Sequence, residues 1–533
     1  MADAGADPVS TLHRVVPNTY RDSVALMAIS AELCSREGVA SASVVMATPA
    51  NLANLAVAGL GLGLSECAGA KPSDILVAVS GTDEACAAAV EAAVELLTAR
   101  TVVSGAHHEE PAASSLQMAV SQDPGLNLAL VSVPGAFAAA EAEKALRLGM
   151  NVMVFSDNVP VEQEVAVKRL ADKLGLMVMG PDCGTAIING VPLGFANVVR
   201  RGPIGVVAAS GTGLQEVTSR IHALGSGVSQ ALGTGGHDLG DAVGGISMLH
   251  GLTALERDPA TQVIVLVSKP PSAVVAANVL ARAQATGKPV VVAFLGADLA
   301  SVTSPTLRVA ATLAEAADIA VQLATPASGG QAAQVDNRPV AAVLDAAAAG
   351  LDERRRYVRG VFCGGTFCYE TQLVLRDHGV TTWSNAPLRA EESLDNVDTS
   401  VAHTVVDMGA DEFTQGRPHP MIDPTGRNDR VVREAVDPTT AVIIIDVVLG
   451  FGSAADPVSG LIDGLQRVGW SADRSAGWPT VLVSVCGTDD DPQCRSGIVD
   501  RLTSVGVLVA PSNAAAARWA AHIVGARGRA ERP

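Results

Sequence analysis

One segment of this sequence combines glycines and hydroxyl side chains in a way that suits anion binding. Ala208-Ala209-Ser210-Gly211-Thr212-Gly213 follows an apolar run and precedes an amphipathic helical pattern. The first N–H groups of a helix lack partners within the helix, and the helix dipole is positive there. Such a turn can therefore bind phosphate or carboxylate without a basic side chain. An ordinary capped turn explains the same residues equally well, and the absence of a following Gly-Lys-Ser/Thr excludes a Walker loop.

Two further glycine-rich segments follow apolar runs. Leu232-Gly233-Thr234-Gly235-Gly236-His237-Asp238 ends the next predicted strand, and Gly364-Gly365-Thr366 follows the predicted strand 357–363. Successive loops at the carboxyl ends of strands line one crevice in a doubly wound sheet. We therefore expect Gly235 and Gly236 to face the same ligand as Ser210. The alternative for Gly364-Gly365-Thr366 is a simple helix cap.

Two histidines and one arginine are candidates for proton transfer and carboxylate binding. His237 could act as an acid or base, although a single loop histidine is more often a capping or solvated residue. Arg417 and His419 lie in a proline-bracketed loop that also contains acidic residues. Arginine suits bidentate carboxylate binding and histidine suits proton transfer near neutral pH, so this loop could clamp a small carboxylate. A surface ion-pair network would look the same.

Apolar runs alternate with amphipathic helical patterns along most of the chain, which predicts an α/β protein. At 533 residues, several domains are expected. A segment rich in Gly, Gln, Asn and Pro marks a linker after the second doubly wound block. The expected division is a small α/β module at 1–105, a Rossmann-like domain at 125–202, a second doubly wound domain at 203–325, a linker at 326–345 and a C-terminal α/β domain at 346–533.

Composition argues against several classes of partner. The formal net charge of -18 and the absence of a Lys/Arg-rich run argue against nucleic acid and acidic membranes as partners. The start of the sequence resembles neither a signal peptide nor a transit sequence, and no apolar run is long enough for a membrane span. We expect a cytoplasmic protein. The 8 cysteines contain no CxxC pair, so neither disulfides nor a metal site is expected.

A longer resemblance covers residues 131–289. VSVPGAF, SDNVP, GPDCGTAIING, IGVVAASGT, GTGGHD, DPATQVIVLV and GKPVV occur in this order, and the segment resembles the α subunit of succinyl-CoA synthetase. The resemblance implies a Rossmann-like domain of the CoA-binding type followed by flavodoxin-like domains. It also implies that Ser210, Gly211 and Thr212, with Gly213, bind phosphate.

The sequence departs from that family at three places. Residues 292–304 contain no histidine, whereas the family places its phosphohistidine there. Lys269 stands where the family has the acidic residue that steadies the phosphohistidine, so Lys269 could hold an anionic substrate instead. The family's N-terminal glycine-rich coenzyme A loop has no clear counterpart. No cofactor is therefore certain, and coenzyme A is the one that the resemblance allows.

The C-terminal third resembles the FdrA proteins. FCGGTFCYE from Phe362, DMG with GRPHPMID from Asp407, and IDVVLG from Ile445 carry this likeness, and YRDSV from Tyr20 fits the family's N-terminal module. Some members are similar to a component of oxamate carbamoyltransferase in allantoin breakdown, which works with companion subunits in an oligomer.

Three functions follow from this resemblance. Carbamoyl transfer from carbamoyl phosphate needs an anion site and substrate orientation but no phosphoenzyme, so we favour an acyl or carbamoyl transferase that takes a small anionic substrate. The alternatives are an acyl-CoA synthetase similar to succinyl-CoA ligase and a scaffold that binds ligand without catalysis.

Overall fold

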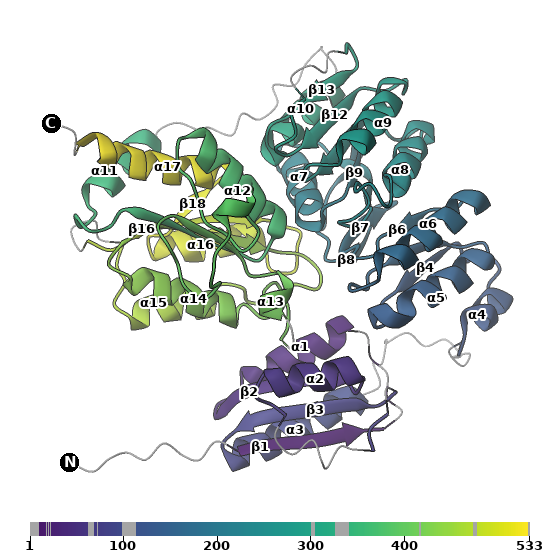
Figure 1. The fold of residues 1–533 in the computed structure, drawn as a ribbon, viewed down its shortest axis with the longest axis horizontal. Helices are drawn as coiled ribbons and strands as arrows, with labels where there is room; N and C mark the ends of the chain where they lie inside the picture. Colours follow the sequence, from purple (N-terminus) through teal and green to yellow (C-terminus); the bar gives the residue numbers. More distant parts are fainter. Residues whose placement is uncertain are drawn as a thin grey trace. The chain divides into compact units, whose positions relative to one another are not determined.

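The computed structural model describes residues 10–17, 19, 21, 23–61, 69–71, 73–98, 113–299, 304–325, 340–414, 417–472 and 477–530. Figure 1 labels the helices and strands. The chain forms two compact units, the first containing Met1–Ser114 with Gly409–Asp423 and the second containing Ser115–Met408 with Pro424–Pro533. Tyr20 and Asp22, which belong to the FdrA-like YRDSV segment, lie outside the described residues. No helix in the described ranges is long and apolar enough to cross a membrane.

The first unit contains a three-stranded antiparallel sheet in the order β1-β3-β2. Its core on one face joins the sheet to α1 and α3, and a smaller cluster on the other face includes Leu55 of α2. The elements are β1 (Ser10–Val16), α1 (Ser23–Cys34), β2 (Val39–Met46), α2 (Pro49–Val57), β3 (Ile75–Gly81) and α3 (Asp83–Thr98). The segment Gly409–Asp423, which the sequence analysis assigns to the C-terminal domain, belongs to this unit and contains α13 (Asp411–Thr414).

The second unit begins with a small Rossmann-like half-sheet. Three parallel strands lie in the order β4-β5-β6, and α5 and α6 connect them. The elements are α4 (Leu116–Gln122), β4 (Leu128–Val131), α5 (Gly135–Arg147), β5 (Asn151–Val154), α6 (Val161–Leu174) and β6 (Val178–Met179). The structure thus places βαβαβ connections where the sequence pattern predicts them.

A hairpin that the sequence analysis does not predict follows this half-sheet. β7 (Thr185–Ile188) and β8 (Val191–Gly194) pair across Asn189 and Gly190, both of which have positive φ. β7 also pairs antiparallel with β10 of the next sheet. Residues 185–194 therefore belong to the neighbouring sheet, although we expected them in the Rossmann-like domain, because this tight turn lets the strand extend that sheet.

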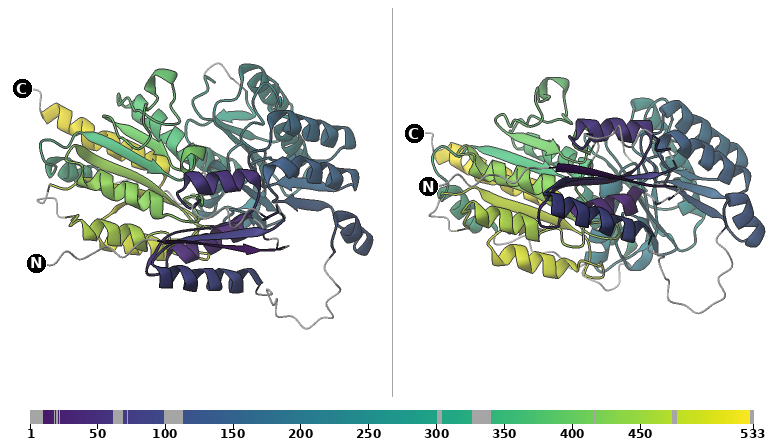
Figure 2. Two further views of the ribbon diagram at one scale, coloured as in Figure 1. Left: turned by 60° about the horizontal axis from the view of Figure 1, so that its bottom comes forward. Right: turned by 90° about the horizontal axis from the view of Figure 1, so that it is seen from below.

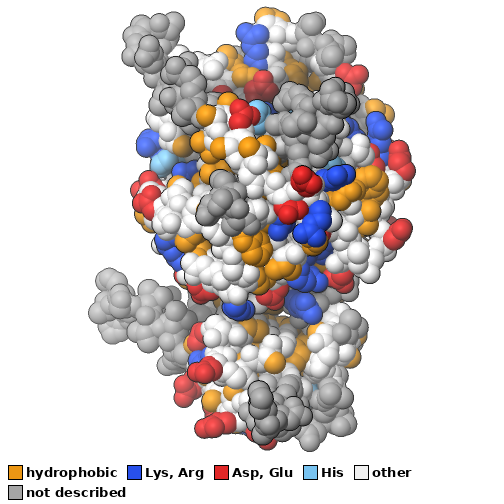
Figure 3. Space-filling model, turned by 90° about the vertical axis from the view of Figure 1, so that its left-hand side faces the viewer, with side chains coloured by type: hydrophobic (Ala, Val, Ile, Leu, Met, Phe, Trp, Pro, Cys, Tyr) orange, Lys and Arg blue, Asp and Glu red, His pale blue; other side chains and the backbone are white. Residues whose placement is uncertain are grey.

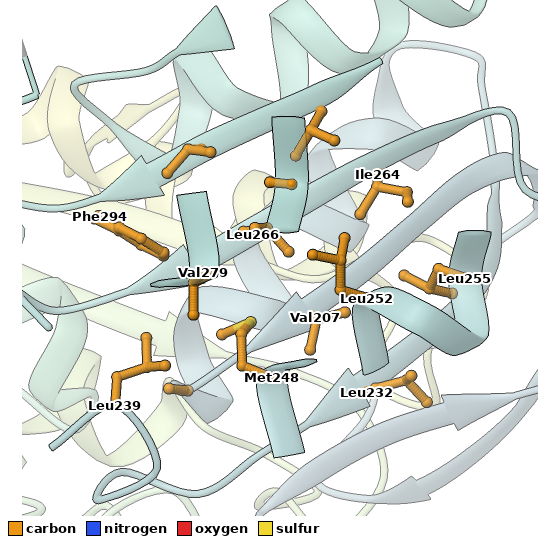
Figure 4. Packing of buried hydrophobic residues seen from close by; sticks show 14 of the residues in the cluster. Val207, Leu232, Leu239, Met248, Leu252, Leu255, Ile264, Leu266, Val279 and Phe294 are labelled. Atoms are coloured by element: carbon orange, nitrogen blue, oxygen red, sulfur yellow. The ribbon is translucent and has the colours of Figure 1, made fainter. Parts of the chain in front are cut away.

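The central module is a seven-stranded sheet in the order β13-β12-β11-β9-β10-β7-β8. Helices α7 and α10 pack on one face, and α8 and α9 cover the other. Figure 4 shows the core between the sheet and α8 and α9, where Val207, Leu252 and Val279 come together. The elements are β9 (Arg201–Ala208), α7 (Gly211–Ala223), β10 (Val228–Gly233), α8 (Ile246–Arg257), β11 (Val263–Ser268), α9 (Ala273–Gln284), β12 (Val290–Phe294), β13 (Leu307–Val309) and α10 (Leu313–Ala324).

The C-terminal module is a five-stranded parallel sheet in the order β15-β14-β16-β17-β18. Helices lie on both of its faces, with α12 and α17 on one and α14 and α15 on the other (Figures 1 and 2). The elements are α11 (Val340–Ala349), β14 (Tyr357–Phe362), α12 (Gly365–Asp377), β15 (Thr404–Asp407), α14 (Thr425–Val436), β16 (Thr440–Val448), α15 (Ser459–Arg467), β17 (Thr480–Cys486), α16 (Arg495–Ser504), β18 (Leu508–Ala510) and α17 (Asn513–Ala530).

The expected linker at 326–345 is only partly within the described residues. Residues 326–339 lie outside them, whereas residues 340–345 form the start of α11. This part of the prediction is wrong because the stretch after Pro339 is rich in alanine, the strongest helix former.

The two larger modules share one strand order. Taking β9 to β13 and β14 to β18 each as strands one to five, both sheets run two-one-three-four-five, which is the flavodoxin-like order. The structure is thus a multidomain α/β protein, as predicted. In this order ligands bind beyond the carboxyl ends of strands one and three, where the direction of winding reverses. The Ser210 turn follows β9, and Gly364 follows β14, so both segments lie at such a reversal.

Figure 3 shows one face of the molecule in space-filling form. On this face Lys and Arg side chains are interspersed with Asp and Glu side chains and with hydrophobic ones. Such a surface does not concentrate positive charge for a polyanionic partner.

Candidate functional site

The N-termini of α7 and α12 meet in the second unit. Ser210 Oγ and Thr366 Oγ1 are 2.6 Å apart, although 156 positions separate them in the sequence. Ser210 Oγ also accepts a hydrogen bond from the Gly213 N–H at 2.9 Å, so Ser210 is the N-cap of α7. Two of the three predicted anion-binding segments are thus brought together, and their unpaired helix N–H groups and dipoles act on one region.

Two glycines allow the helix ends to come this close. A Cβ on Gly364 would lie 2.9 Å from Thr212 Cγ2 and 3.0 Å from Thr212 Oγ1. A Cβ on Gly365 would lie 2.5 Å from Asp407 Oδ2. Any side chain at these positions would push α12 away from Thr212 or from Asp407.

A buried carboxylate fixes the turn that leads into α12. Asp446 on β16 accepts hydrogen bonds from the N–H groups of Cys363 and Gly364, each at 2.8 Å, and lies 3.2 Å from Cys363 Sγ. Burial raises the pKa of Asp446, and the fully buried Arg427 opposes that rise. Arg427 Nη1 donates to the Asp446 carbonyl at 2.9 Å. Asp446 on β16 therefore positions the turn that joins β14 to α12.

A cation and a carboxylate lie at the first residue of α12. Lys269 follows β11, is exposed, and has its Nζ 3.5 Å from the position of a Gly365 Cβ. Asp407 is the last residue of β15, and the Asn385 side chain holds its backbone. Asn385 Nδ2 donates to the Asp407 carbonyl and Asn385 Oδ1 accepts from the Asp407 N–H, each at 2.9 Å. The predicted anion-binding residue Lys269 therefore lies beside Gly365 and Thr366. A bound phosphate would be attracted by Lys269 and by two helix ends, while Asp407 adds an acceptor.

In the loop 232–238, two of the glycines make room for another part of the chain and not for a ligand. Gly235 has φ +85°, and a Cβ there would lie 2.1 Å from the Pro181 carbonyl oxygen. A Cβ on Gly233 would lie 2.5 Å from the Thr185 carbonyl oxygen. The chain itself, in the segment 180–185, makes the close approach that we expected from a ligand. Gly236 has only the Asp182 carboxylate nearby, at 3.8 Å from its Cβ position.

The second loop is anchored by a buried ion triad. Lys168 Nζ lies 2.7 Å from Glu164 Oε1 and 2.8 Å from Asp238 Oδ1, and donates to the Thr234 carbonyl at 3.0 Å. The Thr234 N–H in turn donates to the Ala208 carbonyl at 2.8 Å, which sets the start of the loop beside the Ser210 turn.

His237 projects from this loop. Its side chain is 66% exposed, and its Nδ1 lies 3.4 Å from Glu164 Oε2. Its imidazole thus contacts a carboxylate of the buried triad, and a role as acid or base in the Ser210 site stays a prediction.

Arg417 and His419 belong to the first unit, whereas Ser210 and Thr366 belong to the second. Arg417 is exposed and His419 is partly exposed, with its Nδ1 accepting from the Met421 N–H at 3.2 Å. Burial lowers the pKa of His419 to about 4. The imidazole is then neutral at pH 7, which disfavours the proton transfer near neutral pH that we expected and leaves it as a hydrogen-bond partner.

Cys183 is buried in the segment 180–185, and burial raises the pKa of its thiol to about 12. A thiol with so high a pKa is a poor nucleophile.

Sequence reasoning missed two side chains near the site. Asp407 was identified only as part of an FdrA-like block, although an acid at the end of a buried strand is itself a signal. Tyr369 lies one turn into α12, and its Oη is 3.1 Å from the position of a Cβ on Gly296, which follows β12. Burial raises the pKa of Tyr369, so the phenol is neutral and can donate a hydrogen bond. No spacing in the sequence connects Tyr369 with Gly296.

Three family models match the chain. The model described as CoA-ligase matches residues 361–523, the CoA binding domain matches residues 200–296, and the AllF heavy metal-associated domain matches residues 9–113. Ser210 thus lies in the segment that matches the CoA binding domain, and Thr366 lies in the segment that matches the CoA-ligase model. Within the described residues, no group of three or more His, Cys, Asp or Glu side chains could hold a metal ion.

Relatives fall into two groups. The uncharacterized protein YahF of Escherichia coli is 44% identical over 503 residues, which cover 94% of this chain and 96% of YahF. The succinate–CoA ligase [ADP-forming] subunit alpha of Methanothermobacter thermautotrophicus is 28% identical over 28% of this chain and 51% of that subunit. The ADP-forming sulfoacetate-CoA ligase subunit SauD of Bilophila wadsworthia is 28% identical over 30% of this chain and 55% of SauD. The ligase subunits are thus matched over about half of their length.

Proposed function

Because the chain belongs to the family of Escherichia coli YahF, which is similar over its full length, we propose that it is an FdrA-type subunit that transfers an acyl or carbamoyl group from a phosphorylated donor. The observation that carries this proposal is the 2.6 Å contact between Ser210 Oγ and Thr366 Oγ1. It joins two helix N-termini beside Lys269. Such a region holds a phosphate through N–H groups, hydroxyls and one cation.

The chemistry requires positioning more than covalent catalysis. In carbamoyl transfer the acceptor nitrogen attacks the carbamoyl carbon, the bond from that carbon to the phosphate oxygen breaks, and inorganic phosphate leaves with the proton that the acceptor nitrogen loses. We assign the donor phosphate to Ser210, Thr366 and Lys269, because charge grows on the phosphate as the bond breaks. Asp407 is assigned to an N–H group of the acceptor, since a carboxylate accepts from amides. On the FdrA resemblance, the proposed acceptor is oxamate, the pathway is allantoin catabolism, and companion subunits complete the enzyme.

Acyl-CoA ligation is the second candidate, and the CoA-ligase and CoA binding matches favour it. A ligase of this type passes a phosphoryl group between acyl phosphate and nucleotide, yet residues 292–304 contain no histidine to carry it. Coenzyme A would then be the acceptor of the acyl group, and another side chain would have to replace the missing carrier. For this reason we place ligation second.

A paired assay separates these functions. Phosphate release is measured with carbamoyl phosphate and oxamate, and thioester formation with ATP, coenzyme A and succinate, each with and without the products of neighbouring genes. We expect oxamate-dependent phosphate release that falls about 10- to 100-fold in Ser210→Ala and Thr366→Val, because each loses a hydrogen bond to a charged group.

Ser115→Ala is the matched control, because Ser115 caps α4 through the Met118 N–H and lies outside the site. Its activity should equal that of the unmodified chain. ATP-dependent thioester formation would establish the ligase instead. If neither phosphate release nor thioester formation is detected with all companion proteins present, the remaining function is that of a binding scaffold.

A further inference from the structure

Two buried glutamates occupy equivalent positions on the helices that form the candidate site. Glu216 is five residues beyond Gly211 in α7, and Glu370 is five residues beyond Gly365 in α12. Only 6% of Glu216 and 1% of Glu370 is exposed. With a rise of about 1.5 Å per residue, each lies roughly 7.5 Å along its helix from the anion-binding end. The pair therefore lies behind the site, where α7 and α12 are in contact.

Glu370 has a hydrogen-bond donor for each carboxylate oxygen. Its Oε1 accepts from the Leu313 N–H at 2.8 Å, at the start of α10, and its Oε2 accepts from Asn513 Nδ2 at 2.8 Å. Arg518 of α17 adds a favourable charge. Burial raises the pKa of Glu370, and these three groups oppose the rise. Glu370 is thus the member of the pair that is equipped to be ionised.

Glu216 does not have a comparable set of groups that stabilise its ionised form. The groups that face it are Glu370 from α12, Arg220 from its own helix, Arg495 from α16 and the Cys486 thiol from β17. Burial is the main cause that raises the pKa of Glu216 to about 7, and the like charge of Glu370 is the next. Near neutral pH, Glu216 therefore gains or loses a proton when the local charge changes.

We infer that binding of a doubly charged anion at the N-termini of α7 and α12 is coupled to uptake of a proton by the Glu216–Glu370 pair. This inference rests on the proposed function, because it needs the anion site. An anion placed at the helix ends disfavours a second negative charge on Glu216, so binding and protonation assist each other. The pair would make the site bind donor phosphate more tightly in the acidic range.

The size of the coupling follows from charge separation. A doubly charged anion roughly 10 Å away, at an effective dielectric constant of about 20, shifts a pKa by about two units. Affinity for the anion should then fall roughly 100-fold as pH rises from about 7, the pKa of Glu216 in the free protein, to about 9, its raised pKa in the complex. Above that range the affinity should level off, because Glu216 is then ionised both in the free protein and in the complex.

Sulfate is the probe, because it keeps two charges throughout this pH range, whereas inorganic phosphate itself titrates. Isothermal titration calorimetry near neutral pH, in two buffers of different ionisation enthalpy, counts the protons taken up by the whole chain. We expect uptake of a substantial fraction of one proton, and none in Glu216→Gln. Glu315→Gln removes an exposed carboxylate of α10 and should keep the uptake.

The outcomes separate this inference from the proposed function. Sulfate binding that weakens in Ser210→Ala but takes up no proton in the unmodified chain would overturn the inference and leave the anion site intact. The same conclusion follows if Glu216→Gln retains the full pH dependence. Absence of any Ser210-dependent sulfate binding would overturn both. The proton count on the unmodified chain needs no variant, so misfolding of Glu216→Gln cannot hide the answer.

Discussion

Lys168→Met should destabilise the second unit strongly, because Lys168 is the only cation of a buried triad. The exposed fractions of the Lys168, Glu164 and Asp238 side chains are 0%, 1% and 0%, and both carboxylates lie within 2.8 Å of Lys168 Nζ. Replacement by methionine leaves two buried carboxylates with only the exposed His237, whose Nδ1 lies 3.4 Å from Glu164 Oε2, nearby. Breaking a buried ion pair in this way costs about 3–5 kcal/mol.

The matched control is Lys173→Met, which removes an exposed lysine from the same helix and should change stability by no more than about 0.5 kcal/mol. Thermal melting gives the overall loss. Hydrogen exchange of peptides from α6 and from the loop that ends β10 then shows where protection is lost. We expect faster exchange in both segments of Lys168→Met.

A second variant tests the electrostatic reason. Adding Glu164→Gln to Lys168→Met should recover part of the stability, because Asp238 still accepts from the N–H groups of Ser247 and Met248 at 3.1 and 2.8 Å. In the double variant Asp238 is the one buried carboxylate of the triad that remains, and these two N–H groups still donate hydrogen bonds to it. The reasoning is refuted if Lys168→Met melts like Lys173→Met, or if the added Glu164→Gln lowers stability further.

Three further predictions concern packing and titration. Gly235→Ala should cost about 1–3 kcal/mol of stability, because φ is positive and the new Cβ would meet a carbonyl oxygen at 2.1 Å, whereas Gly236→Ala should cost little in the same melting assay. In native protein a thiol reagent should label the exposed Cys494 rapidly and Cys183 only on unfolding, as mass spectrometry would show. Burial lowers the pKa of His419 to about 4, so the unfolded chain binds more protons than the folded chain between pH 4 and 6.5. The first unit should therefore lose up to about 3 kcal/mol of stability as pH falls through that window. In pH-dependent melting, His419→Gln should reduce this loss.

The local sequence pattern predicts most strands and helices of this chain, because the hydrophobic periodicity of each element lies within its own residues. The predicted strand at 357–363 agrees with β14, which spans Tyr357–Phe362. The β7–β8 hairpin escaped prediction although Asn189-Gly190 is a strong turn signal, because its strands are only four residues long. The pairing of β7 with β10 could not be derived, since register between distant segments leaves no local trace.

The candidate site shows the same limit more sharply. Gly235 and Gly365 give the same signal in sequence, a glycine after a buried strand, yet the chain itself approaches Gly235 whereas Asp407 and Lys269 approach Gly365. Sequence spacing cannot distinguish these cases, because the approaching group comes from another segment. The resemblance to the ligase α subunit directed attention to Ser210, and the glycine-rich turn after a predicted strand directed it to Thr366, but only the fold brings the two hydroxyls to 2.6 Å.

The repeated strand order explains why the site lies between α7 and α12. Each helix follows strand one of its own sheet, so two modules that pack these helices together bring two reversal points to one place. The residues that follow the other strands differ, however, because Lys269 comes after β11 whereas Asp407 comes from β15. The site therefore has a cationic contribution from one module and a carboxylate from the other. A substrate with a phosphate at one end and an amide at the other would bind such a site in a single orientation.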